Sequence, residues 1–321
     1  MDAAGQLALK PSQFLGIPIA LVGAVFLSLG AQLQHHGVAK VEANTQDAGG
    51  GLSPKQLGLL LARPSWVIGT LMIGLAIAFQ LASLVVAPII VVQPLGAVAL
   101  VLTAIVNARV SKVELNRSSI VAISLCVGGV GGFVIVAAIF AREVAVSDNA
   151  LVLILAILAV VLAAFGLLFG LLRNRFKAIM YIIAAGVLYG FVATLAKVVI
   201  VRVAQGNADW RLVLCIIGIF AAAGFGAYFV QNAYSSGPPD LVIAGLTVVD
   251  PLVAVTIGIV ILNEATEAPL WAAIAFVLFG AVATWGVFLL AKHHPQTKDD
   301  AMTNAARALV KPDSQGSSGL D

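Results

Sequence analysis

Residues 65–108 read SWVIGTLMIGLAIAFQLASLVVAPIIVVQPLGAVALVLTAIVNA and contain no charged side chain. A bilayer core about 30 Å thick is crossed by a helix of about 20 apolar residues, so this stretch is too long for one crossing. Pro88 lies near its middle, lacks a backbone N–H and disfavours helix at Ala87. The stretch therefore predicts two membrane helices, 65–87 and 88–108.

The rest of the chain repeats this apolar pattern. Hydrophobic residues make up 61% of the 321 positions and charged residues 10%, whereas a soluble domain carries about 25% charge. The composition excludes a soluble protein and predicts an all-α, polytopic membrane protein with about nine transmembrane helices. The seven further helices are expected at 14–34, 118–141, 149–172, 178–201, 212–234, 241–262 and 270–291.

The basic residues of the expected loops are distributed unequally. Counting from the N-terminal side, 4 Lys and Arg fall on that side and 13 on the other. Basic loops stay in the cytoplasm, so we expect the N-terminus outside, the C-terminus inside and the protein in the plasma (inner) membrane. Residues 1–13 are then extracytoplasmic, and 292–321 form a polar, disordered cytoplasmic tail.

Two parts of the chain resemble each other. VVQPLGAV from Val91 and VVDPLVAV from Val248 share a V-V-x-P-L-x-A-V core, and a polar residue, Asn107 or Glu264, follows each proline by 13 positions. Four helices in 14–141 would then recur in 178–291, with 149–172 as a linker helix. Because five crossings separate matching helices, the two units are inverted, as in alternating-access transporters with a midplane site.

Formal charge inside the nine segments is confined to Lys197 and Asp250. Charge at membrane depth is costly, and such residues are candidates for a substrate or ion pathway. Asp250 would bind a cation or cycle a proton; alternatively it stays protonated and hydrogen-bonds a neighbouring helix. Lys197 would snorkel to the outer interface, or pair with Asp250 if tilt closes a gap of roughly 15 Å along the membrane normal.

Uncharged polar side chains and prolines complete the candidate site. Gln93 precedes Pro94 as Asp250 precedes Pro251, and both prolines are expected to interrupt their helices. The further pathway candidates are Gln34, which falls opposite Lys197 in the repeat, Gln80 and Tyr189. Gly128-xxx-Gly132 and Gly166-xxx-Gly170 predict close helix packing.

The stretch from Arg63 to Glu114, with its R-P-x-W opening, Ala87-Pro88 and V-Q-P-L-G-A, resembles the NIPA-type magnesium transporters of the drug/metabolite transporter superfamily. The second half, with D-P-L-V-A-V and Asn263-Glu264, resembles the EamA-like repeat of the same superfamily. The layout is similar to a fused antiparallel pair of small multidrug resistance proteins. The resemblance implies an alternating-access carrier driven by an ion gradient or a membrane potential.

The leading expectation is therefore a secondary transporter of small molecules, a metabolite or a drug, coupled to ions or protons. Alternatives are a transporter of Mg²⁺ or another divalent cation, with Asp250 as the metal ligand, and a non-transporting membrane scaffold. No P-loop, nucleophile elbow, zinc-ligand spacing or dinucleotide-binding glycine motif occurs, so we expect neither an enzyme nor a cofactor. The expected partners are the lipid bilayer and the substrate, not nucleic acid; a homodimer is left open.

Overall fold

The computed structural model describes residues 14–44, 61–110, 117–142, 144–172, 177–207, 209–236 and 239–293. Within these ranges all regular structure is helical, and nine segments are long and apolar enough to cross a membrane. This is the architecture of a polytopic helical membrane protein. The elements are α2 (Gly16–Asn44), α4 (Pro64–Val86), α5 (Ile89–Val92), a 3-10 turn η2 (Gln93–Leu95), α6 (Gly96–Val110), α7 (Arg117–Phe140), α8 (Asp148–Leu172), α9 (Ala178–Ala204), α10 (Trp210–Ser236), α11 (Pro239–Val260) and α12 (Leu270–His293).

The predicted break at 87/88 is confirmed. α4 ends at Val86, Ala87 and Pro88 are both extended (ψ 153° and 150°), and α5 begins at Ile89. The proline ring excludes helical geometry at the preceding residue, which separates α4 from α5 as the sequence predicted. The short helix α5, the turn η2 and α6 together make the third crossing.

Helix α2 differs from the prediction. Its membrane span ends at Gln34, as predicted, but the helix itself continues to Asn44. The stretch 35–44 contains Gly37 but no proline, and its Ala, Lys and Glu residues favour helix outside the membrane as well. Residues 45–60, and both chain termini outside 14–293, lie beyond the described residues.

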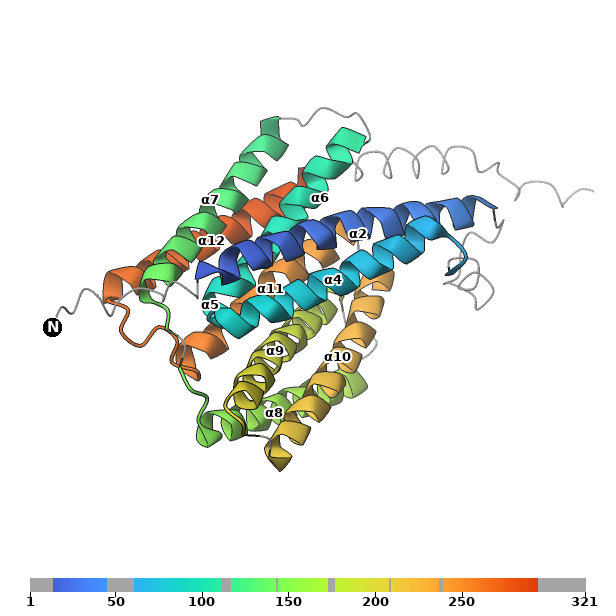
Figure 1. Ribbon diagram of the computed structural model, residues 1–321. Helices are drawn as coiled ribbons and strands as arrows, with labels where there is room; N and C mark the ends of the chain where they lie inside the picture. The colour runs from blue at the N-terminus through green and yellow to red at the C-terminus, as the bar shows by residue number, and fades with distance from the viewer. Residues whose placement is uncertain are drawn as a thin grey trace, which may run out of the picture.

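The helices pack in a pattern that Figure 1 makes visible. α2 lies along α4 and also contacts α6, while α9 lies between α10 and α11, and α7 packs on α12. We call the end of the bundle at which α2 begins, on the left in Figure 1, the N-terminal end. The break between α4 and α5 lies at this end.

Burial separates the central helix from the peripheral ones. In α9, 61% of the apolar span is buried, against 17% in α8. Buried positions therefore dominate α9, whereas α8, the expected linker helix, presents most of its surface to lipid. Residues that face the interior of this protein are accordingly concentrated on α9 and on the third crossing, of which 56% is buried.

Glycines allow α2 to approach α4 closely. Gly16, Gly23, Gly30 and Gly37 recur every seven residues, and an ideal Cβ at each would lie within 3.1 Å of an α4 atom or of Ala87 just beyond it. A repeat of seven keeps these glycines on one face of the helix. Small residues at such positions bring two backbones together in a membrane.

The α7–α12 interface supplies a matched stability test. An ideal Cβ at Gly129 would lie 2.5 Å from the backbone nitrogen of Ala283, whereas one at Gly128 meets nothing within 4 Å. We expect Gly129→Ala to lower the free energy of unfolding by about 1–3 kcal/mol, because the backbone of α12 must move. Gly128→Ala should leave it unchanged or raise it by about 0.5–1 kcal/mol. Thermal unfolding in detergent measures both; equal losses would contradict this packing.

The same glycines correct the small-residue prediction. Gly132 does meet a neighbour, the ring of Phe279, but Gly128, Gly166 and Gly170 face open space. The contacting glycines on α7 are Gly132 and Gly129, the latter one position along from the predicted Gly128. The spacing alone indicated a small-residue face and could not select which glycines a partner helix covers.

Candidate functional site

A cavity of about 710 Å³ lies in the middle of the bundle. One wall comes from α2 and α4, the opposite wall from α9 and α11, and η2 and α6 lie between them. The lining residues of α9 and α11, from Tyr189 to Ala196 and from Leu246 to Pro251, are near the centres of their helices. The volume falls within the roughly 300–1,000 Å³ of small-molecule sites.

Four of the predicted pathway residues line this one cavity, each from a different element. They are Gln80 on α4, Gln93 in η2, Tyr189 on α9 and Asp250 on α11. Most of the remaining wall is aliphatic. Polar side chains that are far apart in sequence thus converge on an otherwise apolar space.

Asp250 is the charged residue of the cavity; no other charged side chain lines it among the described residues. Its Oδ1 atom is buried and, within the described part of the chain, has no hydrogen-bond partner. The backbone of α9 is held against Asp250 by Gly190, at which a Cβ would lie 3.0 Å from the Asp250 carbonyl oxygen. An ionised carboxylate in this position is costly, so the site favours a proton or a cation on Asp250.

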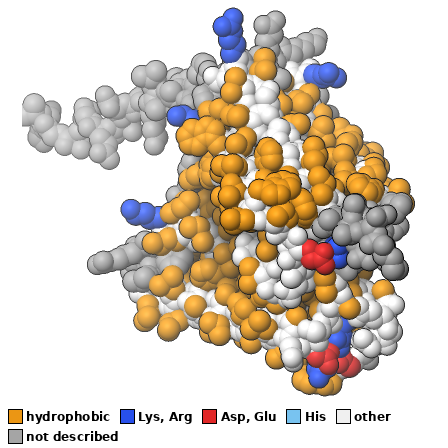
Figure 2. All heavy atoms as spheres, turned by 90° about the vertical axis from the view of Figure 1, so that its left-hand side faces the viewer, with side chains coloured by type: hydrophobic (Ala, Val, Ile, Leu, Met, Phe, Trp, Pro, Cys, Tyr) orange, Lys and Arg blue, Asp and Glu red, His pale blue; other side chains and the backbone are white. Residues whose placement is uncertain are grey.

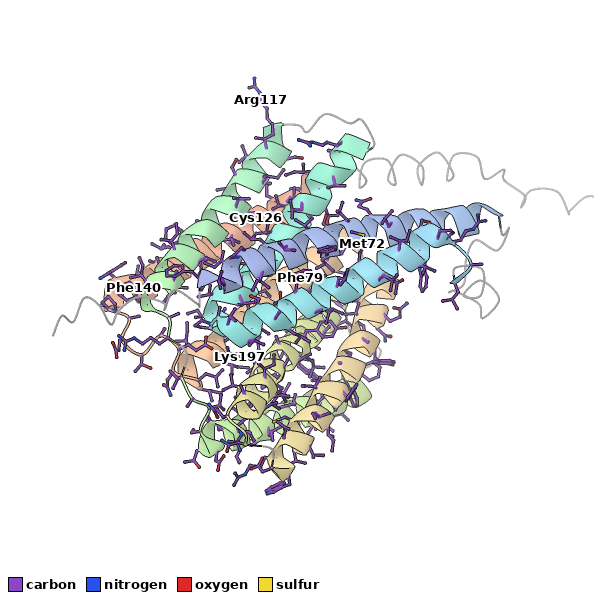
Figure 3. All side chains as sticks on the ribbon, in the orientation of Figure 1. Met72, Phe79, Arg117, Cys126, Phe140 and Lys197 are labelled. Carbon is purple, nitrogen blue, oxygen red and sulfur yellow. The ribbon has the colours of Figure 1, made fainter. Side chains whose placement is uncertain are left out.

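Lys197 lies elsewhere. Its side chain is 2% exposed, and Nζ donates hydrogen bonds to the carbonyl oxygens of Leu84 (2.6 Å) and Ala87 (3.0 Å), at the C-terminal end of α4. Figure 3 shows Lys197 on α9 where this end of α4 passes. Lys197 is not among the described residues that line the cavity around Asp250. The expectation that it snorkels to the interface is wrong because its ammonium is buried against main-chain oxygens.

Glu264 is a buried charged residue that the sequence reasoning did not assign to the site. It is 3% exposed, and its carboxylate accepts hydrogen bonds from the backbone N–H groups of Ile89 (3.0 Å) and Ile90 (2.9 Å) at the start of α5. Its position 13 residues after Pro251 was visible in the sequence. What was missing was a reason for it to turn inward, which Asn263 supplies with a left-handed φ of 58°.

Gln34 does not reach the cavity. Its Nε2 donates to Thr70 Oγ1 (2.8 Å), on the part of α4 near the opposite end of the bundle from the break. The repeat placed Gln34 opposite Lys197, but the two side chains serve different contacts. Gln34 links α2 to α4, and Lys197 links α9 to the end of α4.

The two prolines behave differently. Pro94 lies in the 3-10 turn η2, where the α-helix is locally tightened, but α11 runs through Pro251 without a break. The expected interruption at Pro251 is therefore not observed. Proline leaves the carbonyl of Thr247 without its helical donor, and Thr247 lines the cavity, where polar partners can satisfy that oxygen. Both prolines also line a second, apolar pocket of about 60 Å³ between α6, α7, α11 and α12.

Ion pairs mark the N-terminal end of the bundle. Arg202 and Arg211 each pair with both Asp148 and Asp209, which ties the start of α8 to the facing ends of α9 and α10. Figure 2 views this end, where acidic side chains lie beside basic ones on a mostly hydrophobic surface. Pairing of this kind neutralises charge close to the membrane without contributing to the cavity.

Metal-ligating side chains are sparse. Across the described ranges, no three His, Cys, Asp or Glu side chains lie together in a way that could hold a metal ion. A cation in the central cavity would therefore meet one carboxylate, Asp250, with the side-chain oxygens of Gln80, Gln93 and Tyr189 as neutral candidates.

Comparison with known proteins adds no activity. A protein of Corynebacterium glutamicum described as uncharacterized is 24% identical over 265 residues, covering 82% of this chain and 90% of its own. No protein-family model matches the chain. No solved structure matches it either. The chain is thus a polytopic helical membrane protein that is similar over most of its length to this corynebacterial protein.

Proposed function

We propose that this protein is a secondary transporter that moves small organic cations by alternating access, in exchange for protons. The single observation that carries the proposal is the central cavity, in which a lone carboxylate with a buried, unpartnered oxygen meets aliphatic walls. A group of this kind alternates between two neutral states, protonated or paired with a cation. Binding of a cation then releases the proton, and binding of a proton releases the cation.

The arrangement of the two halves supports this proposal. In the N-terminal half α2 contacts α4 and α6, and in the C-terminal half α9 contacts α10 and α11, so equivalent helices of the proposed repeats make equivalent contacts. Pro94 and Pro251, the matched prolines, line the same small pocket. The cavity lies between the halves, where the site of an inverted-repeat transporter is expected. Rocking of one half against the other would expose it to each side in turn.

The charge of the cavity favours cations over anions. Asp250 supplies a negative charge, and no Lys, Arg or His side chain of the described residues lines the space to attract an anion. The aliphatic walls suit an organic cation that has little need of a complete hydration shell. One monovalent cation entering as one proton leaves keeps the exchange electrically neutral.

A Mg²⁺ transporter is the second candidate, and the cavity is large enough for a hydrated ion. Mg²⁺ dehydrates reluctantly, usually keeps several waters and needs only one or two carboxylates from a protein. A cavity of about 710 Å³ has room for the ion with its waters, and Asp250 would be the carboxylate. The sequence resemblance to NIPA-type magnesium transporters points the same way.

The further parts of the proposal follow from the loops and the composition. Thirteen of the eighteen Lys and Arg residues fall on the C-terminal side of the membrane and four on the N-terminal side, so we assign the C-terminal side to the cytoplasm of a plasma membrane. The transporter would need no cofactor, bind no nucleic acid and act on its substrate without chemistry. A homodimer remains compatible with it.

Transport by purified protein in liposomes tests the proposal. The liposomes are acidic inside and neutral outside, and radiolabelled tetraethylammonium is added outside. This cation has no titratable nitrogen, so a pH gradient cannot trap it without a carrier. We expect uptake that requires the protein and disappears when the pH gradient is collapsed.

A parallel set of liposomes holds a trapped Mg²⁺ indicator under an imposed membrane potential. Potential-driven Mg²⁺ entry without exchange of tetraethylammonium would replace the leading proposal with the second. Absence of both activities, in protein that is monodisperse and unfolds cooperatively, would contradict both and favour a non-transporting scaffold.

A further inference from the structure

The break between α4 and α5 lies at the N-terminal end of the bundle. A positively charged side chain binds one side of this break, and a negatively charged side chain binds the other. The ammonium of Lys197 binds two carbonyl oxygens at the end of α4, that of Leu84 (2.6 Å) and that of Ala87 just beyond the helix (3.0 Å). The carboxylate of Glu264 binds the first N–H groups of α5, those of Ile89 (3.0 Å) and Ile90 (2.9 Å). We call this set of four hydrogen bonds the break clamp.

The chemistry of helix ends explains the signs. The end of a helix exposes carbonyl oxygens with partial negative charge, and the start exposes N–H groups with partial positive charge. Ala87, Ile89 and Ile90 are fully buried, so water cannot satisfy these groups. A cation at the end of α4 and an anion at the start of α5 are therefore the complement that the break requires.

The two charges come from the other half of the protein. The break belongs to the third crossing, whereas Lys197 is on α9 and Glu264 follows α11. Gly258 makes room for this contact, since a Cβ there would lie 2.6 Å from Ile89 Cγ2 and 3.2 Å from Glu264 Oε2. Glu264 is held in turn by its own backbone, whose N–H donates to Gly258 O (3.0 Å) and whose carbonyl accepts from Arg142 N (2.7 Å).

The break clamp also borders the central cavity. Leu84, whose carbonyl binds Lys197, is one of the residues that line the cavity, and so is Ala196, the residue before Lys197. The clamp thus joins the two halves where the cavity ends toward the N-terminal side. Contacts that join two halves at one end of such a cavity must separate before a path opens at that end.

We propose that Lys197 and Glu264 are the gating residues of the N-terminal side: the clamp closes the cavity there, and its release opens the cavity to that side. This inference rests on the proposed function for its place in a transport cycle, but the gate itself is a structural property. Lys197 and Glu264 position the broken helix and do not touch the substrate.

Accessibility of a thiol inside the cavity tests the gate without a transport assay. Ala24→Cys places a thiol on the cavity wall, in a background with Cys126→Ala and Cys215→Ala. A membrane-impermeant maleimide is added to one side of sealed vesicles at a time. Glu264→Ala should raise the labelling rate from the N-terminal side by about tenfold or more and leave the rate from the other side equal or lower.

Glu267→Ala is the matched control. Glu267 lies in the same loop three residues from Glu264, but it is exposed and pairs with Arg142 at the surface. Its removal should leave labelling from both sides unchanged. If Glu264→Ala, shown to be folded by its unfolding transition, labels at the rate of Glu267→Ala, the gate is disproved.

A reversible cross-link keeps the test decisive if Glu264→Ala does not fold. Ile89→Cys with Gly258→Cys joins α5 to α11 at the clamp, where the two residues are in contact. Oxidation should slow labelling of Ala24→Cys from the N-terminal side, and a reductant should restore it. Unchanged labelling after complete cross-linking would overturn the proposal. Because labelling needs no substrate, a gate without tetraethylammonium or Mg²⁺ transport would contradict the proposed function alone.

Discussion

Replacing Asp250 with asparagine is expected to reduce cation exchange to the level of protein-free liposomes. The amide has nearly the shape of the carboxylic acid but can neither release a proton nor carry the negative charge that attracts a cation. Because Asp250 is the one charged side chain among the described residues that line the cavity, no neighbour can replace it. Uptake of tetraethylammonium driven by a pH gradient measures the loss.

Stability distinguishes a functional role from a structural one. Oδ1 of Asp250 has no hydrogen-bond partner among the described residues, so the fold loses little when the carboxyl becomes an amide. We expect the thermal midpoint of Asp250→Asn to equal or exceed that of the wild type, as is common where an active group is held at a cost to stability. Thr256→Val, on the same helix with a hydroxyl bound to its own helix at Leu252, is the control and should keep full transport. Full exchange by Asp250→Asn would remove Asp250 from the mechanism.

Lys197→Met is expected to lower the free energy of unfolding by about 2–4 kcal/mol. Methionine keeps most of the length and apolar stem of lysine but donates no hydrogen bond, so the carbonyls of Leu84 and Ala87 lose their donor in a buried place. Unfolding in mixed micelles measures the loss. Lys292→Met, at the exposed end of α12, makes the same chemical change outside the clamp and should have no effect.

The double variant shows whether the clamp acts as a unit. Lys197 and Glu264 bind the two sides of one break, at Ala87 and Ile89, which are two residues apart in the chain. Each charged side chain should therefore stabilise the fold less when the other is absent. We expect Lys197→Met with Glu264→Gln to be destabilised less than the sum of the two single variants, by about 0.5–3 kcal/mol. Strict additivity would show that the two ends of the break are held independently.

Local properties of the sequence were sufficient for the helices and for the break. The number of crossings follows from runs of apolar residues, and the division at 87/88 from the geometry that a proline imposes on the residue before it. The predicted end of α2 at residue 34 is too early, because a helix that leaves the membrane can continue through polar residues in water. At Pro251 the error is the opposite one, because α11 continues through a proline that was expected to interrupt it.

The sequence predicts the polar residues of the cavity better than it predicts the hydrogen-bond partners of Lys197 and Glu264. Polar residues in apolar helices must face the interior, which is why Gln80, Gln93, Tyr189 and Asp250 were found and why they converge. Lys197 and Glu264 bind main-chain atoms 113 and 175 residues away, and every residue has such atoms. The sequence shows which buried side chains need hydrogen-bond partners. It does not show which backbone groups will be those partners, because nearly every residue has the same backbone groups and their positions depend on the completed fold.

The separation in sequence also sets an order of assembly. A ribosome produces α4, with its unsatisfied carbonyls at Leu84 and Ala87, long before it produces Lys197, and Glu264 follows later still. When α9 leaves the translocon, the oxygens that receive its ammonium are already in the bilayer. The N–H groups of Ile89 and Ile90 must wait for the residues that follow α11, so the break should become resistant to proteases only after α11 has been made.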